Sequence, residues 1–116
     1  MIKIKRIYNG LDENDGYRIL VDRLWPRGIS KENAHIDLWM KEISPSPELR
    51  KWYCHDPEKW DLFYALYEKE LNENPEVLKR VLQLEKLYDN VTLLYAAKDI
   101  QHTHAIVIED ILKNIN

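Results

Sequence analysis

Apolar and polar residues form four short patterns that predict β-strands. IKIKRIY, residues 2–8, alternates apolar and basic side chains, as a half-exposed strand does. YRILVD, residues 17–22, holds three consecutive apolar residues, and VTLLYAA, residues 91–97, is a longer apolar run. Both runs are typical of strands that are covered on both faces of a parallel sheet. HIDLWMKEI, residues 35–43, alternates well enough for a fourth strand, although a short helix would also fit.

One helix-start pattern occurs three times in the middle of the chain, at Ser46–Glu48, Asp56–Glu58 and Asn74–Glu76. Each copy has a residue that can cap a free backbone N–H and a proline that loses no hydrogen bond at the first helical position. An acid follows, which meets the positive end of the helix dipole. We therefore predict three helices from these points, and a further amphipathic helix after the loop KDIQ, residues 98–101.

These elements predict a single α/β domain over residues 1–116. Strands that alternate with helices, with the apolar runs in the middle, indicate a small, mostly parallel sheet flanked by helices. A chain of 116 residues is long enough to bury one core but not two, and no repeat or linker divides it.

Composition and charge narrow the classes of function. The formal net charge of −3 argues against general nucleic-acid binding, which usually shows a basic excess, but leaves room for a local cationic pocket. No apolar run approaches the roughly 20 residues of a membrane span, and the N-terminus lacks the apolar core of a signal peptide. Cys54 is the only cysteine, so no intrachain disulfide can form, which suits a cytoplasmic protein.

Charged and aromatic side chains follow two of the predicted strands, at the point where each strand ends. Ligands of open parallel sheets bind beyond the carboxyl ends of the strands. If the two strands are neighbours, their side chains converge at one edge of the sheet. The residues concerned are Asp22, Arg23, Trp25 and Arg27 after one strand, and Lys98, Asp99, His102 and His104 after the other.

This edge predicts a site for a small anionic ligand with a phosphate or carboxylate group. Arg23 and Arg27 offer bidentate hydrogen bonds, Lys98 adds a positive charge, and Trp25 can form a flat wall. A structural alternative stays open, in which Asp22 pairs with either arginine to hold the loop and Trp25 caps the core.

Four further interpretations each leave an alternative open. His55 can reach a cleft between two helices or hydrogen-bond the carbonyls that end the preceding helix. Asp99 can act on a ligand or cap the last helix. His104 aligns with the apolar face of that helix, which favours an inner histidine, and Arg50 can reach the site or stay in solvent. Our catalytic candidates are His55, Asp99 and Asp22, and our ligand-binding candidates are Arg23, Trp25, Arg27, Arg50, Lys98 and His104.

Thiol, metal and dinucleotide chemistry find little support. A phosphatase-like loop needs an arginine six positions after Cys54, and that position holds Trp60. His102 and His104 are two residues apart, about 200° around a helix, so they cannot bind one ion from a helix. The three glycines form no nucleotide-binding motif. We predict no metal and no cofactor.

Three segments resemble a known family in order and spacing: ILVDRLWPRG, residues 19–28, SPSPELRKWYCHDPEKWDLF, residues 44–63, and LLYAAKDIQHTHAIV, residues 93–107. They are similar to the YeaO-like group of the domain-of-unknown-function 488 family. Thr103 departs from the family's His-Asn-His pattern. The resemblance implies an α/β fold and a small cytoplasmic protein of bacteria or archaea, and it implies no established activity.

Three classes of function therefore stay open. An enzyme acting on a small anionic substrate stands slightly ahead of a binding or sensing module that uses the same pocket. The third class is a protein–protein interaction module, and a homo-oligomer is left open. Its partner surface would be formed by the aromatic residues of the helices, Trp52, Tyr53, Trp60, Phe63, Tyr64 and Tyr67.

Overall fold

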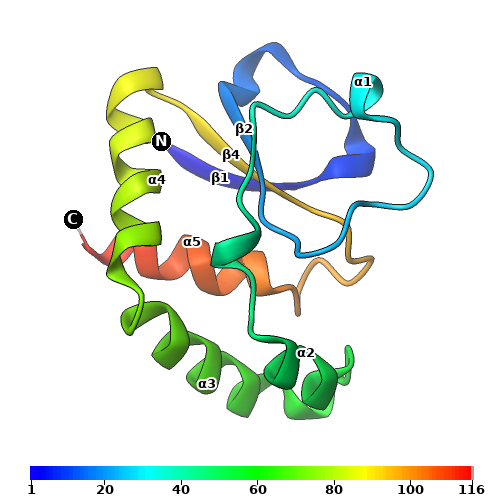
Figure 1. The fold of residues 1–116 in the computed structure, drawn as a ribbon, viewed down its shortest axis with the longest axis vertical. Coiled ribbons are helices and arrows are strands. Elements are labelled where there is room, and N and C mark those ends of the chain that lie inside the picture. The colour runs from blue at the N-terminus through cyan, green and yellow to red at the C-terminus, as the bar shows by residue number, and fades with distance from the viewer. Residues whose placement is uncertain (116) are drawn as a thin grey trace.

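The computed structural model describes residues 1–115 and has a four-stranded parallel sheet at its centre (Figure 1). This arrangement confirms the predicted α/β fold. The two strands that precede the charged loops, β2 and β4, are neighbours in the middle of the sheet, with Leu20 opposite Leu94. The sheet order is β1-β4-β2-β3, where the strands are β1 (Ile2–Arg6), β2 (Tyr17–Leu20), β3 (Leu38–Trp39) and β4 (Val91–Tyr95).

Residues 1–115 form five α-helices, none of which is long and apolar enough to cross a membrane. The helices are α1 (Lys31–Ala34), α2 (Pro47–Tyr53), α3 (Trp60–Asn72), α4 (Pro75–Tyr88) and α5 (His104–Ile115). Short 3-10 turns occupy Ile7–Asn9, Glu13–Asp15, Lys41–Ile43 and Pro57–Lys59.

The three predicted helix starts are found, with two local differences. The Ser46 hydroxyl accepts a hydrogen bond from the Leu49 N–H at 3.2 Å, so α2 begins at its proline as expected. Asp56 caps a 3-10 turn, and the α-helix proper begins only at Trp60. Helix α4 begins at its proline, but the Asn74 side chain makes no capping hydrogen bond.

The strand predicted at residues 35–43 is much shorter in the structure. Only Leu38 and Trp39 are paired, both with β2, and a 3-10 turn follows at Lys41–Ile43. Strand β2 itself ends at Leu20, whose carbonyl accepts the Met40 N–H at 2.9 Å. Beyond this point β3 has no residues of β2 with which to pair.

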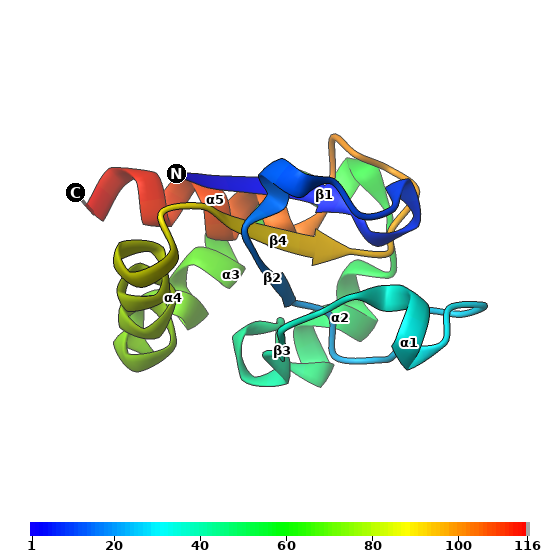
Figure 2. The same cartoon turned by 90° about the horizontal axis from the view of Figure 1, so that it is seen from above.

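The two faces of the sheet are covered differently, because side chains alternate along each strand. Ile19 and Leu93 face the main core, which contains buried residues of α2, α3, α4 and α5. Leu20 and Leu94 face a smaller core that is closed by Ala34 of α1 and by loop residues. Figures 1 and 2 show the long helices α3, α4 and α5 on the main-core side and α1 with its loops on the other. The main core on the helical side thus contains most of the buried hydrophobic residues.

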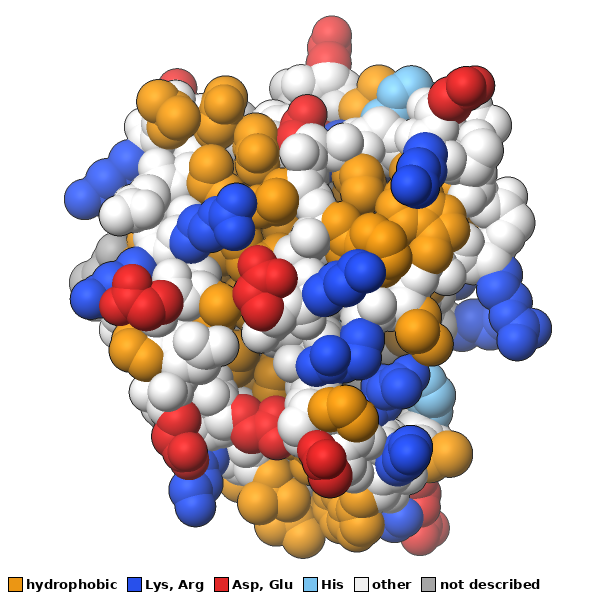
Figure 3. All heavy atoms as spheres, in the orientation of Figure 1, with side chains coloured by type: hydrophobic (Ala, Val, Ile, Leu, Met, Phe, Trp, Pro, Cys, Tyr) orange, Lys and Arg blue, Asp and Glu red, His pale blue; other side chains and the backbone are white. Residues whose placement is uncertain are grey.

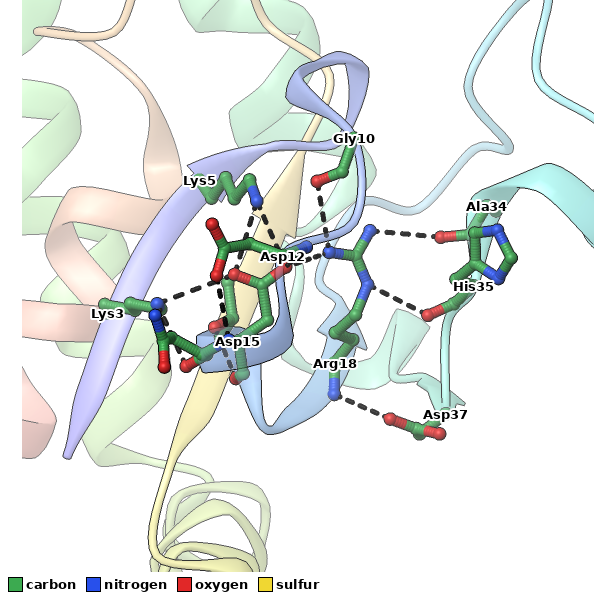
Figure 4. A network of polar contacts seen from close by, with 11 residues as sticks. Lys3, Lys5, Gly10, Asp12, Asp15, Arg18, Ala34, His35 and Asp37 are labelled. Atoms are coloured by element: carbon green, nitrogen blue, oxygen red, sulfur yellow. Dashed lines mark hydrogen bonds and ion pairs between the residues drawn. The ribbon is translucent and has the colours of Figure 1, made fainter.

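A buried ionic network occupies the loop-covered face (Figure 4). Arg18 donates to the Asp15 carboxylate and to the carbonyls of Gly10, Ala34 and His35. Lys5 lies 3.1 Å from the same carboxylate. Burial raises the pKa of Asp15, but the hydrogen bonds from Lys5, the Asp12 backbone and Arg18 outweigh it, so the pKa lies below its usual value. This network ties the polar loop after β1 to the sheet.

Candidate functional site

A cavity of about 650 Å³ lies beyond the carboxyl ends of β2 and β4. The loops that follow these strands form two of its walls. The 3-10 turn after β1, the segment before α2, α2 with the turn after it, α3 and the start of α5 complete it. The structure brings all nine sequence candidates to this one cavity, where the lining includes Asp22, Arg23, Trp25, Arg27, Arg50, His55, Lys98, Asp99 and His104.

The charge of the cavity is opposite in sign to that of the whole chain. Four cationic side chains and two acidic ones line it, an excess of two positive charges with histidines neutral, against −3 for the chain. Figure 3 shows Lys and Arg side chains gathered over α2 and the neighbouring loops, in the lower right of that face. A local excess of this kind attracts anions even to an acidic protein.

Arg23 is the half-buried cation of the site, and one of its buried donors has no partner in residues 1–115. Its Nη2 donates to the Pro45 carbonyl at 3.1 Å, which holds the guanidinium against the segment before α2. Its Nε is buried and has no hydrogen-bond partner among residues 1–115. An unpaired buried donor costs on the order of 1–3 kcal/mol, so this guanidinium has capacity for an additional acceptor.

Asp22 and His104 form a half-buried pair in the cavity, with side chains 16% exposed and Oδ1 3.4 Å from Nε2. The Ala96 N–H donates to Asp22 Oδ2 at 2.9 Å, and His104 Nε2 lies 3.0 Å from the Val21 carbonyl. A carbonyl can only accept, so Nε2 carries a proton. Asp22 therefore pairs with a histidine and a backbone amide, and not with Arg23 or Arg27 as the structural alternative proposed.

Burial moves the pKa values of this pair in opposite directions. It raises the pKa of Asp22, an effect that His104, the Ala96 N–H and His55 partly offset. It lowers the pKa of His104, which Asp22 and the Val21 carbonyl partly offset. Both shifts favour the uncharged forms, as expected for groups that lose water.

The loop between β4 and α5 presents Lys98 and Asp99 to the cavity, and here one structural alternative was wrong. Helix α5 begins at His104, so Asp99 does not cap it. The Asp99 carboxylate instead accepts the N–H groups of Gln101 and His102 and lies 2.7 Å from His102 Nδ1. These bonds, the one to the His102 ring first, lower the pKa of Asp99. Thr103, the departure from the family pattern, is buried, and its hydroxyl accepts the Ala105 N–H at 3.4 Å.

The chain leaves the end of α2 in an unusual backbone conformation. Cys54 and His55 both have positive φ, 46° and 56°, which residues other than glycine rarely adopt. The N–H groups of Cys54 and Asp56 bond the carbonyls that end α2, so the predicted structural role for His55 was wrong. The His55 ring forms no hydrogen bond with residues 1–115 and lines the cavity, while Cys54 does not.

Trp25 serves both interpretations at once. Its ring packs against the smaller core, edge-on to Trp39 with centroids 5.2 Å apart, and its Nε1 donates to the Ile29 carbonyl at 2.6 Å. The same ring lines the cavity. Because both the ring and the Nε1 of Trp25 are held by neighbouring residues, this side chain forms a rigid wall of the cavity.

The sequence interpretation missed several lining residues that come from elements far apart in the chain. Arg50 of α2 was among the predicted candidates, but the apolar lining from α2 and α3 was assigned to packing or to a partner surface. The missed residues are Tyr8, Ser44, Pro45, Tyr53, Phe63 and Thr103. No three His, Cys, Asp or Glu side chains of residues 1–115 are grouped so that they could hold a metal ion.

Comparison with known protein families shows to which family the chain belongs. The family model described as the inactive DUF488-N3 subclade matches residues 1–115. The chain belongs to that family. The uncharacterized protein YeaO of Escherichia coli (strain K12) is 43% identical over 114 residues, which cover 98% of each chain. The uncharacterized protein Rv3073c of Mycobacterium tuberculosis (strain ATCC 25618 / H37Rv) is 37% identical over 113 residues, 96% of this chain and 92% of that protein. No solved structure matches this DUF488 chain.

Proposed function

We propose that this DUF488 protein is a non-catalytic module that binds a small phosphate- or carboxylate-bearing ligand in the cavity beyond β2 and β4. The observation that carries the proposal is Arg23, a cation on the cavity wall with a buried N–H that has no partner in residues 1–115. A ligand oxygen that draws the guanidinium toward it would satisfy this donor. Charge-assisted hydrogen bonds of this type are among the stronger ones in proteins.

The remaining cations support the same proposal. Arg27, Arg50 and Lys98 are exposed side chains of three different segments that share the cavity. Exposed cations pay little desolvation and can turn toward an anion, while Arg23 provides a fixed contact deeper in the wall. The cavity volume of about 650 Å³ lies within the range of small-molecule sites, roughly 300–1,000 Å³.

Catalysis is the second candidate function, and the Asp22–His104 pair is the observation that favours it. Two titratable groups that lie 3.4 Å apart in a cavity, and whose pKa values are both shifted by burial, are candidates for proton transfer. The description of the matched subclade as inactive favours binding. We therefore rank the enzyme second, which reverses the order that the sequence suggested.

The interaction module loses support because most of the aromatic residues pack inward. Tyr53, Phe63 and Tyr67 are at most 6% exposed, and Trp52, at 38%, is the most exposed of the six residues. The proposal keeps the cytoplasm as the expected compartment, since the single cysteine cannot form an intrachain disulfide.

The test is thermal unfolding of the wild type and of Arg23→Met in the presence of inorganic phosphate, organic phosphates and carboxylic acids. Methionine keeps the aliphatic stem and removes the guanidinium. A ligand at 100 times its Kd adds about 2.7 kcal/mol, which raises Tm on the order of 10 °C in a domain of this size. We expect at least one compound to raise the Tm of the wild type by this amount and that of Arg23→Met by much less.

Arg80→Met is the matched control, because Arg80 lies on α4 outside the cavity and is exposed. It should keep the full shift. Equal shifts in wild type and Arg23→Met would put the anion elsewhere, and the absence of a shift with every compound would contradict the proposal. Loss of a ligand's chemical integrity during incubation, followed by NMR and abolished by His104→Gln, would favour the enzyme.

A further inference from the structure

We infer that the ligand of this cavity is a nucleoside monophosphate. The inference rests on the proposed anion-binding function and adds to it the chemical class of the ligand. It follows from three features of the lining: flat aromatic walls, an acidic acceptor among the cations, and a local charge excess of two. Each feature restricts the ligand further than a cationic rim does.

The aromatic walls are fixed by contacts with the surrounding protein. Trp25 is held by Trp39 and by its hydrogen bond to the Ile29 carbonyl. The Tyr8 hydroxyl donates to the Arg27 carbonyl at 2.9 Å, and the Arg6 guanidinium lies over one face of the Tyr8 ring, 4.9 Å from its centroid. Tyr8 is nevertheless 42% exposed and lines the cavity. Pre-positioned rings are suited to stacking on a nucleobase, because every base has a flat π-face.

The acidic acceptor favours a ligand that also carries hydrogen-bond donors. Asp22 accepts one backbone N–H and lies beside His104, and an ionised carboxylate has about four acceptor positions in all. A simple anion such as phosphate would meet this carboxylate as a like charge. The ribose hydroxyls and the N–H groups of a nucleotide can donate to it, while the phosphate of the same molecule reaches Arg23.

The charge excess selects among nucleotides. Four cations and two acids leave two positive charges in the cavity, and a phosphate monoester carries about −1.5 to −2 at neutral pH. A monophosphate therefore neutralises the cavity, whereas a triphosphate brings an uncompensated excess of negative charge. A nucleic-acid polymer is disfavoured for a similar reason, because the chain around the cavity has a net charge of −3.

The experiment measures Kd by isothermal titration calorimetry for the four common ribonucleoside 5′-monophosphates, their triphosphates, ribose 5-phosphate and inorganic phosphate. We expect one or more monophosphates to bind at least about tenfold more tightly than ribose 5-phosphate, which is 1.4 kcal/mol and within the range of base stacking. Trp25→Leu should remove this tenfold advantage and leave the affinity for ribose 5-phosphate unchanged. Tyr8→Leu, at a more exposed ring, tests the same wall where the Trp25 variant fails to fold.

Trp52→Leu, an exposed tryptophan of α2 outside the cavity, is the control and should bind as the wild type does. Ribose 5-phosphate binding as tightly as every monophosphate would overturn the nucleotide inference and leave the anion-binding proposal intact. Triphosphates binding tenfold more tightly than monophosphates would overturn the charge argument and with it the inference. Binding of none of these compounds, inorganic phosphate included, would count against both.

Discussion

Two arginines five residues apart, Arg18 in β2 and Arg23 in the loop after it, have opposite environments. Arg18 is 2% exposed, and each of its three side-chain nitrogens donates to a carboxylate or a carbonyl. Arg23 is half-buried, donates once to the Pro45 carbonyl and keeps a buried N–H without a partner in residues 1–115. Each guanidinium nitrogen of Arg18 thus has a hydrogen-bond acceptor, whereas the guanidinium of Arg23 keeps a buried donor without one.

This difference separates a structural ion network from a candidate ligand site. The chain itself satisfies every charge around Arg18, because Asp15 and three backbone carbonyls surround it (Figure 4). The cavity holds more cations than acids, and its two acids, Asp22 and Asp99, pair with histidines and backbone amides. Charge alone does not identify a site, but charge that the fold leaves uncompensated does point to one.

The largest effect is expected for Arg18→Met. The substitution leaves the buried Asp15 carboxylate with only the two lysines and the Asp12 N–H as partners, and it removes the donor to the carbonyls of Ala34 and His35. Removal of one partner from a buried ion pair typically costs 3–5 kcal/mol, and we expect a loss of about 3 kcal/mol in the free energy of unfolding because Lys5 still compensates part of the charge. Urea denaturation at pH 7.5 measures it, with Arg80→Met as an exposed control that should change stability by less than about 0.5 kcal/mol. A loss below about 1 kcal/mol would mean that the network does not stabilise the fold.

A smaller effect should distinguish the two regions by pH. Burial lowers the pKa of His104 below 6.5 in the folded protein, so between pH 7.5 and 5.5 the unfolded chain binds a proton that the folded chain does not. Stability therefore falls over this interval, by at most about 1.4 kcal/mol for one proton over the one pH unit below 6.5. Asp15 has a lowered pKa, so its contribution is present above 3.8 and is lost only at lower pH.

Urea midpoints of wild type and His104→Gln at pH 7.5 and 5.5 check this prediction. The glutamine amide can still donate to the Val21 carbonyl, and the variant should lose less stability on acidification than the wild type does. Asp22 and His55 also interact with His104, and protonation of Asp22, whose pKa is raised, acts in the opposite direction by stabilising the fold as the pH falls. An identical pH dependence in both proteins would exclude His104 as its cause.

The sequence predicted well which strands carry the candidate site, but it predicted poorly which groups pair with the charged side chains. Apolar runs identify β2 and β4 as central strands, and parallel strands end at one edge, so Arg23 and Lys98 could be placed together from pattern alone. The pairing of Asp22 with His104 depends on where α5 starts, which the sequence left open. Arg18 stands between apolar residues of a buried strand, a signal that it needs a buried partner, but periodicity identifies neither Asp15, three residues earlier, nor the carbonyls of Ala34 and His35 as that partner. The contacts with Ala34 and His35 are fixed by packing and not by periodicity.

The smallest effect on stability is expected for Arg23→Met, the counterpart of Arg18→Met. The variant loses one hydrogen bond to the Pro45 carbonyl, worth about 0.5–1.5 kcal/mol net. It also removes the unpartnered buried Nε, whose desolvation costs a similar amount, so the two contributions oppose each other. The free energy of unfolding without ligand should change by less than about 0.5 kcal/mol in the same urea experiment. A loss as large as that of Arg18→Met would assign a structural role to Arg23, and the anion-binding proposal would lose the observation that carries it.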